Sequence, residues 1–391
     1  MFEPITYGPK YHWFGYYDKM QFSPDARFVL GLEAEFEHRA PQVKDTVAVG
    51  MIDLENDNEW IELARTGAWC WQQGCMLQWI PGSANEIIFN DREGDGFVSR
   101  IINVETRAER TVSAAIYTLS PDGRSALGID FHRTGRLRPG YGYAGTDISE
   151  GEKTPVNAGI YSIDLVDGTS ERILSIDQIA STQTTHFSYI GKNVEHWLNH
   201  VLFSPDGKRF IFLHRWLDRN SDAVGNKTRM FTADPDGSEL RCMTDCGMSH
   251  FIWRDAAHIH GWARLEPDGE YGQYLFDEAT GSSELVGNPE RLTANGHMTY
   301  LPGGEWILND NQYERDESSH STYTYLYHVP SDRRANLGSF THDSRYHGEF
   351  RCDLHPRSSR DGRLVCIDSA HHQSRRISLS LSHYFRLRQR K

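Results

Sequence analysis

A short hairpin motif recurs along the chain and limits the folds open to it. In its clearest copies, LSPDGRSALG (119–128) and FSPDGKRFIF (203–212), a Ser-Pro-Asp-Gly turn separates two apolar runs. Proline presets φ at its turn position and Asp-Gly favours the corner with positive φ, so each copy predicts two antiparallel strands. The copies, aligned on the residue before the turn, begin at Phe22, Trp79, Leu119, Phe203, Trp253, Tyr300 and Ser358.

Seven units of this kind predict a closed β-propeller. Successive copies lie 40 to 58 residues apart, except for 84 residues between the third and fourth, where segment 133–157 reads as an inserted surface loop. Each unit holds about four strand-like runs, and such units cannot bury both faces alone. We therefore predict an all-β fold, a seven-bladed β-propeller of four-stranded antiparallel blades, in one domain spanning 1–391. Two separate β-sandwiches are the alternative, but no Pro, Gly or Ser-rich linker divides the chain.

Composition excludes several classes of partner. The net charge of −13 argues against nucleic acid, whose binding depends on neutralised phosphates. No apolar run is long enough to cross a membrane and no leader pattern stands at the start, so we expect no membrane partner and a cytoplasmic location, or a periplasmic one if a leader was removed. Neither C-x-x-C nor zinc-ligand spacing occurs, which predicts buried reduced thiols at Cys70, Cys75, Cys242, Cys246, Cys352 and Cys366.

Histidines fill one column of the repeat. Because the first strand of each propeller blade lines the central channel, equivalent positions form a ring around the axis. A single histidine at a strand start often only bonds neighbouring backbone, but four in register favour a functional ring. Three positions before the aligned residue stand Lys19, Met76, Ile116, His200, His250, His297 and His355.

A second polar column and several aromatic segments are expected at the same mouth. Segments YHWFGYYDK, WCWQQGC and RYHGEFRCDLH add rings and cations on which a sugar could stack and bond, whereas Trp79, Trp253 and Tyr300 are assigned to packing between blades. The second column, eleven positions after the aligned residue, holds Glu33, Asn90, Asp130, His214, Arg264, Asn311 and Ser369. The predicted substrate-binding residues are His12, Trp13, Tyr16, Tyr17, Trp71, Asn199 and Arg351.

Imidazoles beside arginines suit two chemical tasks. One is binding a divalent metal (Mn, Ca or Zn) through His250, His297 and His355, with Asp353 or Glu349 completing or orienting the site. The other is metal-free acid–base work on an anionic sugar. Both meet in β-elimination from a uronate, where the C5 proton becomes acidic once a cation neutralises the adjacent carboxylate.

The motifs HVLFSPDGKRFIFLHRW, SHFIW, GHMTYLPGGEWIL and DLHPRSSRDG resemble the oligogalacturonate lyases and, more loosely, the propeller-type ulvan and rhamnose-glucuronate lyases. The first resemblance implies manganese held by histidines and a glutamine, with His250 and His355 at matching positions. Phe350 stands where that glutamine would be, and Asp353 where an earlier histidine would be. The ulvan-lyase pattern implies a metal-free site built from His200, His214, His250 and Arg264, and it fits this sequence slightly better.

The sequence thus favours a lyase that cleaves an acidic, uronate-containing oligosaccharide. His200 or His214 would be the base, Arg264 and Arg215 the carboxylate clamp, and His355 with Arg351 the far wall. Two alternatives stay open. A glycoside hydrolase would need a carboxylate pair, and a non-catalytic propeller would bind a glycan or protein without turnover. The candidate carboxylates are Glu33, Asp130, Asp353 and Asp18.

Overall fold

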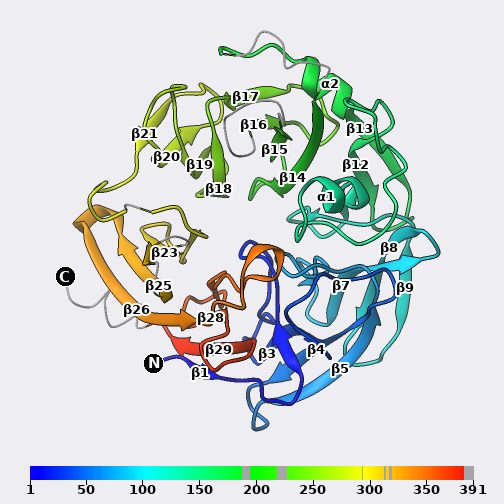
Figure 1. The fold of residues 1–391 in the computed structure, drawn as a ribbon, viewed down its shortest axis with the longest axis vertical. Helices are drawn as coiled ribbons and strands as arrows, with labels where there is room; N and C mark the ends of the chain where they lie inside the picture. Colours follow the sequence, from blue (N-terminus) through cyan, green and yellow to red (C-terminus); the bar gives the residue numbers. More distant parts are fainter. Residues whose placement is uncertain (187–193, 218–226, 293, 312–313, 317–318, 383–391) are drawn as a thin grey trace.

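Seven antiparallel sheets stand around one axis, as the ribbon viewed along that axis shows (Figure 1). The structure is a computed structural model that describes residues 1–186, 194–217, 227–292, 294–311, 314–316 and 319–382. The predicted all-β, seven-bladed propeller is confirmed. Six of the seven blades have four strands each. The remaining one, blade 6, has five strands because β24 and β26 both pair with β25.

The strands follow one another blade by blade along the chain. Blades 1 and 2 comprise β2 (Tyr11–Trp13), β3 (Phe28–Ala34), β4 (Val47–Asp53) and β5 (Glu59–Thr66), then β6 (Gln78–Trp79), β7 (Glu86–Glu93), β8 (Gly96–Asn103) and β9 (Glu109–Val112). Blades 3 and 4 comprise β10 (Thr118–Leu119), β11 (Ser125–Ile129), β12 (Gly159–Asp164) and β13 (Ser170–Ser175), then β14 (Glu195–Phe203), β15 (Phe210–Leu217), β16 (Lys227–Ala233) and β17 (Arg241–Thr244). Blade 5 comprises β18 (Met248–Trp253), β19 (His258–Ala263), β20 (Gly272–Asp277) and β21 (Ser283–Leu285).

The two ends of the chain close the ring together. Blade 6 comprises β22 (Thr299–Tyr300), β23 (Trp306–Asp310), β24 (Glu314–Asp316), β25 (Ser319–His328) and β26 (Arg333–His342), and blade 7 comprises β27 (Arg357–Ser358), β28 (Leu364–Ser369), β29 (Arg376–Leu381) and β1 (Glu3–Pro4). Strand β1 pairs with β29, with Glu3 opposite Leu379. Pairing an N-terminal strand with C-terminal strands covers an edge that would otherwise be open.

The predicted turns share one hydrogen-bond pattern. In the fourth blade, the Ser204 hydroxyl donates to Asp206 at 2.7 Å and accepts the backbone N–H of Arg209 at 3.0 Å. The same serine–aspartate pair closes the turns of blades 1, 3 and 7. The recurring sequence therefore encodes one local conformation, which fixes the register of the first two strands of each of these blades.

Side chains at the aligned position bind the preceding blade. The indole N–H of Trp79 donates to the carbonyl of Gln21 at 3.1 Å, and that of Trp253 donates to the carbonyl of Leu202 at 3.2 Å. Tyr300 Oη lies 3.2 Å from Nδ1 of His260. The inter-blade packing predicted for these three aromatic residues is confirmed.

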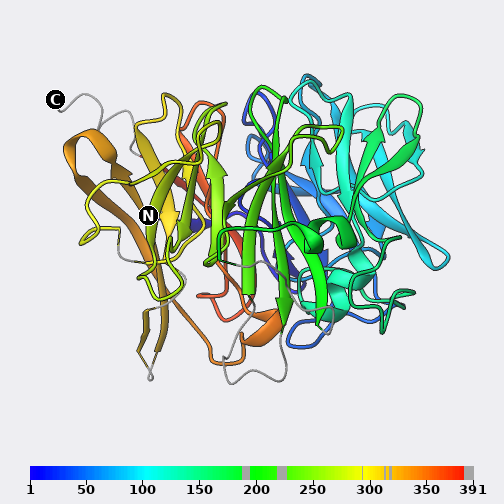
Figure 2. The same cartoon turned by 90° about the horizontal axis from the view of Figure 1, so that it is seen from above.

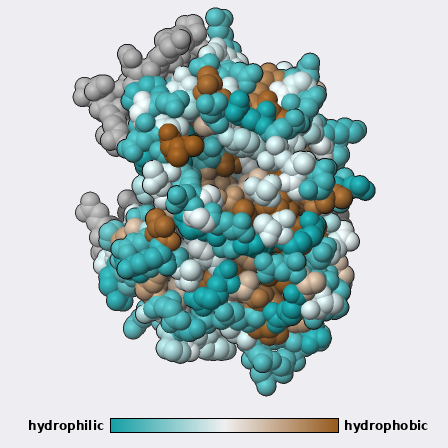
Figure 3. Space-filling view, turned by 90° about the vertical axis from the view of Figure 1, so that its right-hand side faces the viewer, coloured by the Kyte–Doolittle hydropathy of each residue, from teal (hydrophilic) through white to brown (hydrophobic). Residues whose placement is uncertain are grey.

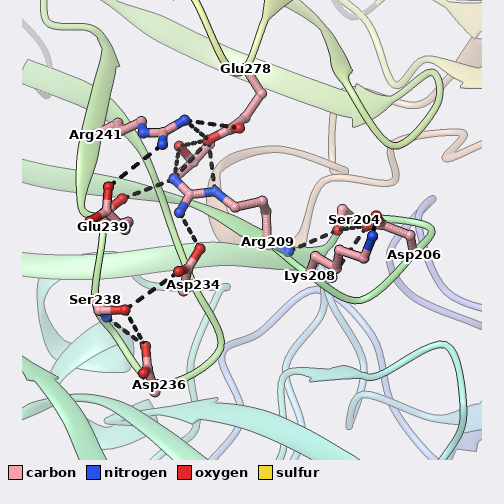
Figure 4. A network of polar contacts seen from close by, with 11 residues as sticks. Ser204, Asp206, Lys208, Arg209, Asp234, Asp236, Ser238, Glu239, Arg241 and Glu278 are labelled. Carbon is pink, nitrogen blue, oxygen red and sulfur yellow. Dashed lines mark hydrogen bonds and ion pairs between the residues drawn. The ribbon is translucent and has the colours of Figure 1, made fainter.

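A buried ion network joins blades 4 and 5 (Figure 4). The guanidinium of Arg209 donates to Glu278 at 2.7 Å and to Asp234 at 2.5 Å, and Arg241 approaches Glu278 at 3.3 Å. The side chains of Arg209 and Glu278 are only 10% and 9% exposed. Since a buried charge without a partner is costly, this network holds the two blades in a fixed relation.

The predicted insertion is not a simple surface loop. It begins inside helix α1 (Phe131–Leu137), and Arg133 within it is buried and donates to the carbonyl of His196 at 2.6 Å. A second helix, α2 (Ile176–Ser181), and the short helices η1 (Val329–Ser331) and η2 (Gly348–Phe350) complete the helical elements of the described ranges. None of these helices has the length and apolar character needed to span a bilayer. The outer face in Figure 3 is mostly hydrophilic, with apolar residues scattered over it.

Candidate functional site

The four column histidines meet at the propeller axis, as predicted. The ring centroids of His250 and His297 are 4.3 Å apart, and those of His297 and His355 are 4.2 Å apart. His200 joins them through Tyr17, whose ring centroid lies 5.5 Å from that of His200 and 6.0 Å from that of His250. Residues more than 150 positions apart in the chain therefore form one cluster.

Irregular backbone directs these side chains toward the axis. The pairing of β14 with β15 shifts register between Asn199 and Leu202, and β18 and β19 shift between Met248 and Phe251. His200 and His355 have φ of 53° and 43°, and Met76, in the same column, has φ of 57°. A bulge with a left-handed residue re-aims a side chain out of the normal alternation, at a cost in backbone strain that is common at functional sites.

Two tyrosines occupy the centre of the histidine cluster. The ring of Tyr16 packs edge-on against His200 at 4.9 Å and His355 at 5.2 Å. Tyr17 is fixed more firmly, because its hydroxyl donates to the carbonyl of Phe251 at 2.8 Å and accepts the Phe251 N–H at 3.1 Å. Both tyrosines, predicted to bind substrate, thus stand among the imidazoles.

Two imidazoles are oriented as metal ligands would be. Nδ1 of His250 lies 2.8 Å from the amide oxygen of Asn295, and Nδ1 of His297 lies 3.0 Å from Asp310. Such bonds hold the proton on Nδ1 and present Nε2 as the ligand atom. Within the described part of the chain, Nε2 of His297 and of His355 is buried without a hydrogen-bond partner. Asp353 offers a carboxylate oxygen within 4.8 Å of ligand atoms of both.

Burial favours the neutral imidazole at His200, His250 and His355. Burial lowers the pKa of His250 and of His355 well below the usual value, and the neighbouring His297 lowers both further. Burial also lowers the pKa of His200, although Asp18 opposes that effect. Neutral imidazole is the form that accepts a proton or binds a metal ion, so the site is prepared for either task.

His200 has a buried acidic partner. Its Nε2 lies 3.3 Å from Asp18 Oδ2, and the same carboxylate oxygen accepts from Lys19 at 3.1 Å. Burial opposes ionisation of Asp18, but the charge of Lys19 and the contact with His200 lower its pKa to about 2. The Tyr117 hydroxyl accepts the backbone N–H of His200 at 2.9 Å. His200 thus has a buried carboxylate close to one ring nitrogen, an arrangement that would stabilise the imidazolium of a histidine base.

Cations gather beside the cluster around Tyr141. Arg351 donates to the Tyr141 hydroxyl at 2.6 Å, and Arg138 lies over the Tyr141 ring at 4.9 Å. The pKa of Arg215 is lowered to about 10, chiefly by burial and further by the nearby charge of Arg138. Tyr141 and Tyr16 oppose this shift only in part. Arg138 and Tyr141 belong to the 133–157 insertion, whose RTGRLRPGYGY stretch was the signal for them. Sequence reasoning missed both because it treated that segment as a surface loop.

Two predicted catalytic residues, His214 and Arg264, have their hydrogen-bond partners away from the histidine cluster. Nδ1 of His214 accepts from Arg229 at 3.2 Å, and its Nε2 lies 2.9 Å from Nδ1 of His196. Arg264 donates to the carbonyl of Cys246 and lies over the ring of Tyr271 at 5.4 Å. Among the described residues, neither side chain makes a hydrogen bond or ring contact with the four clustered imidazoles. These two members of the second polar column therefore do not join the first, because Arg229, His196 and the Cys246 carbonyl engage them.

Several residues predicted to bind substrate lie in the core of the protein. Trp13 and Trp71 are 1% and 2% exposed and pack with Trp69, with the Trp13 and Trp71 rings 4.8 Å apart. Their large apolar surface is buried between blades 1 and 2, where it forms part of the core. His12 sits on β2 with Nε2 3.0 Å from Glu33, and burial lowers its pKa to about 4. Asn199 is buried beside His200.

No protein-family model and no curated protein sequence matches this chain. Several solved structures match it in fold. Oligogalacturonate lyase from Vibrio parahaemolyticus superposes with a TM-score of 0.67 at 14% identity, covering 97% of this chain and 92% of that one. In fold, this chain resembles oligogalacturonate lyase. An oligogalacturonate lyase in complex with manganese gives the same TM-score of 0.67 at 15% identity, over 97% and 96% of the two chains.

The propeller scaffold also occurs in another class of enzyme. A prolyl endopeptidase superposes with a TM-score of 0.50 at 9% identity, and the match covers 95% of this chain and 50% of that one. One fold hosts different chemistries, so the fold does not decide the reaction. The residues at the axis must carry any argument about function.

Proposed function

We propose that this protein is a carbohydrate-active lyase that cleaves a uronate-containing oligosaccharide by β-elimination. The observation that carries the proposal is the group of inward-facing imidazoles of His250, His297 and His355 next to Asp353, flanked by the arginines around Tyr141. A site with neutral nitrogen bases and several fixed cations suits an anionic sugar whose carboxylate must be neutralised. The proposed partner is an acidic oligosaccharide, and the proposed location is cytoplasmic.

The residues present fit a divalent metal ion. Buried Nε2 atoms of His297 and His355 without partners, an oriented His250 and the Asp353 carboxylate form a nitrogen–oxygen donor set of the kind that Mn²⁺ or Zn²⁺ accepts. Asp353, which stands where the resembled family has a histidine, would supply an oxygen ligand in its place. When bound there, the ion would act as a Lewis acid that neutralises the uronate carboxylate.

His200 is the proposed base in place of His214. The C5–H bond breaks with its proton passing to the imidazole of His200, the electron pair forms the C4–C5 double bond, and the C4–O bond to the leaving sugar breaks. Asp18 stabilises the imidazolium that results. His200 is fully enclosed, with the Phe251 ring stacked on it at 3.9 Å and the Tyr16 ring edge-on at 4.9 Å, so the substrate reaches it only after neighbouring side chains move.

Arg215 is the proposed clamp for the substrate carboxylate, with Arg351 and Arg138 beside it. The charge of Arg215 reaches both His200 and His250, since it lowers the pKa of each. Arg264 is left out of this assignment, because it binds the Cys246 carbonyl. Preorganised cations of this kind stabilise the enolate-like charge that develops at the carboxylate, by about 3 to 4 kcal/mol per donor.

The hydrolase alternative has less support from the geometry. A hydrolase needs two carboxyl groups facing each other across the scissile bond. Glu33 binds Lys10 and His12 on blade 1, and Asp130 accepts the Gly159 N–H and the Tyr161 hydroxyl on blade 3. These two candidates therefore serve local contacts in separate blades, whereas Asp18 accepts from Lys19 at 3.1 Å and Asp353 accepts from Arg351 at 2.8 Å.

The test is a spectrophotometric assay on galacturonate and glucuronate-containing oligosaccharides, with and without added Mn²⁺. We expect a rise in ultraviolet absorbance from the unsaturated product, and a loss of about 10² to 10⁴-fold in rate for His200→Ala. His258→Gln, a partly exposed histidine on β19, is the matched control and should keep full activity.

Two outcomes would overturn the proposal. Folded protein that produces no double bond across the whole panel, but binds a glycan, would be a binding propeller. A new reducing end without a double bond would establish a hydrolase.

A further inference from the structure

A second group of ligand-type side chains lies outside the axis, where blade 4 meets blade 5. Nδ1 of His186 is 2.7 Å from Asp245 Oδ1 and 3.1 Å from the sulfur of Cys246. That sulfur is in turn 3.4 Å from Asp245 Oδ1. A nitrogen, an oxygen and a sulfur from two distant segments thus converge on one point.

Backbone contacts hold these three side chains in place. The other oxygen of Asp245 accepts the backbone N–H of His186 at 2.7 Å, so one carboxylate fixes both the ring and the main chain of that histidine. Arg264 donates to the carbonyl of Cys246, and the Thr244 hydroxyl accepts the Cys246 N–H at 3.4 Å. The donor atoms are therefore positioned by the fold itself.

One of the three separations matches what a small tetrahedral ion requires, and the other two are shorter. A zinc ion with bonds of about 2.0 to 2.3 Å holds its ligand atoms ~3.3 to 3.6 Å apart. The Cys246 to Asp245 separation already has that value, and the two separations from His186 need to widen by about half an ångström. His186 lies partly open to solvent and follows α2 in the connection toward β14, so a small outward movement of its ring achieves this.

We propose that His186, Asp245 and Cys246 form a zinc site, independent of the histidine cluster at the axis. Nitrogen, oxygen and sulfur donors together select a borderline-soft divalent ion over Mg²⁺ or Ca²⁺. On binding, the S–H bond of Cys246 breaks, its proton passes to water, and a Zn–S bond forms. Water supplies the fourth ligand from a cavity of about 590 Å³ that His186 and Asp245 line.

Glu266 occupies the position of an outer-sphere partner. Its carboxylate lies 3.4 Å from Nε2 of His186, the ring nitrogen that would not bind the ion. A carboxylate on the distal nitrogen fixes the tautomer that leaves Nδ1 free for the metal and makes it more basic. Bound zinc would then tie segment 183–186 to the connection between β17 and β18.

Cobalt titration of the full chain, first freed of metal with a chelator, tests the site. Co²⁺ takes the same ligands as zinc, and a thiolate ligand produces a charge-transfer band in the near ultraviolet that imidazole and carboxylate ligands do not. The axial cluster has only nitrogen and oxygen donors, so the band reports this site alone. We expect the band at one equivalent, its displacement by Zn²⁺, and about 10 to 100-fold weaker binding in Glu266→Gln.

Two serine variants provide the matched comparison. Cys242 lines the same cavity but is not one of the three ligands, so Cys242→Ser should keep the band whereas Cys246→Ser should lose it. If Cys246→Ser fails to fold, His186→Ala, on a surface segment, must show the same loss. A folded wild-type chain without the band, or a band that survives in Cys246→Ser or His186→Ala, would overturn the proposal.

Discussion

Asp18 lies against His200 with its carboxylate 3.3 Å from the imidazole, and both side chains are fully enclosed at the axis of the propeller. The two residues come from blades 1 and 4, and Lys19 and Tyr16, one and two positions from Asp18 in the chain, contact the same small volume. A buried carboxylate beside a buried imidazole sets both the orientation and the basicity of that ring.

Asp18→Asn tests this relationship. Asp18 raises the pKa of His200 against the effect of burial, so its removal lowers that pKa further. The base must be unprotonated to act; hence the acidic limb of the pH–rate profile should move to lower pH, with kcat reduced at least about tenfold. Asp206→Asn, in the turn at the far end of β14, is the control. An unchanged acidic limb would show that Asp18 has no influence on the base.

The buried His260 should make folding sensitive to acid. Burial lowers its pKa from 6.5 to about 4, so the unfolded chain binds a proton that the folded chain does not between these values. Stability is then full above pH 6.5 and falls as the pH drops toward 4, by on the order of 3 kcal/mol for this group. Urea unfolding across this range should give a flatter pH dependence for His260→Gln than for wild type. The control is His258→Gln on the same strand, and an equal slope in all three proteins would refute the assignment.

Breaking the inter-blade ion network should destabilise the whole propeller. Glu278→Gln removes the charge that faces Arg209 and Arg241 and leaves the buried Arg209 with one fewer carboxylate partner. We expect the free energy of unfolding to fall by about 3 kcal/mol. Lys208→Ala, drawn in the same view (Figure 4), removes an exposed pair with Asp206 at 3.7 Å and should cost at most about 0.5 kcal/mol. Equal losses in chemical denaturation would contradict the special role of the buried pair.

Close contact between neighbouring turns should make one turn glycine irreplaceable. Gly123 has φ of 69°, and an added Cβ would collide with the carbonyl oxygen of Pro81 in blade 2. Gly168 has φ of 76° with open space around it. Gly168→Ala therefore meets no clash, and the strain of a left-handed alanine should lower the free energy of unfolding by about 1 kcal/mol. Gly123→Ala should cost about 1 to 3 kcal/mol more, measured by thermal or urea unfolding. Similar losses for the two variants would mean that the turns do not pack as closely as the structure indicates.

The sequence alone determined the architecture because the architecture is repetitive and local. A Ser-Pro-Asp-Gly turn fixes its own hydrogen bonds, as at Ser204 and Asp206, so each copy encodes a hairpin without reference to the rest of the chain. The histidine column followed from the same register, since equivalent positions in equivalent blades must face one axis. The meeting of His200, His250, His297 and His355 could therefore be predicted without coordinates.

Only the tertiary structure decided which neighbours each side chain would have. His214 and Arg264 share a repeat position, but long polar side chains bond to the nearest available partner, here Arg229 and the Cys246 carbonyl, and no repeat pattern encodes that choice. Arg138 reaches the axial site, and His186 reaches Cys246, through connections whose path has no periodic signal. Repeats determine what recurs from blade to blade, whereas irregular connections are placed by packing against the assembled ring.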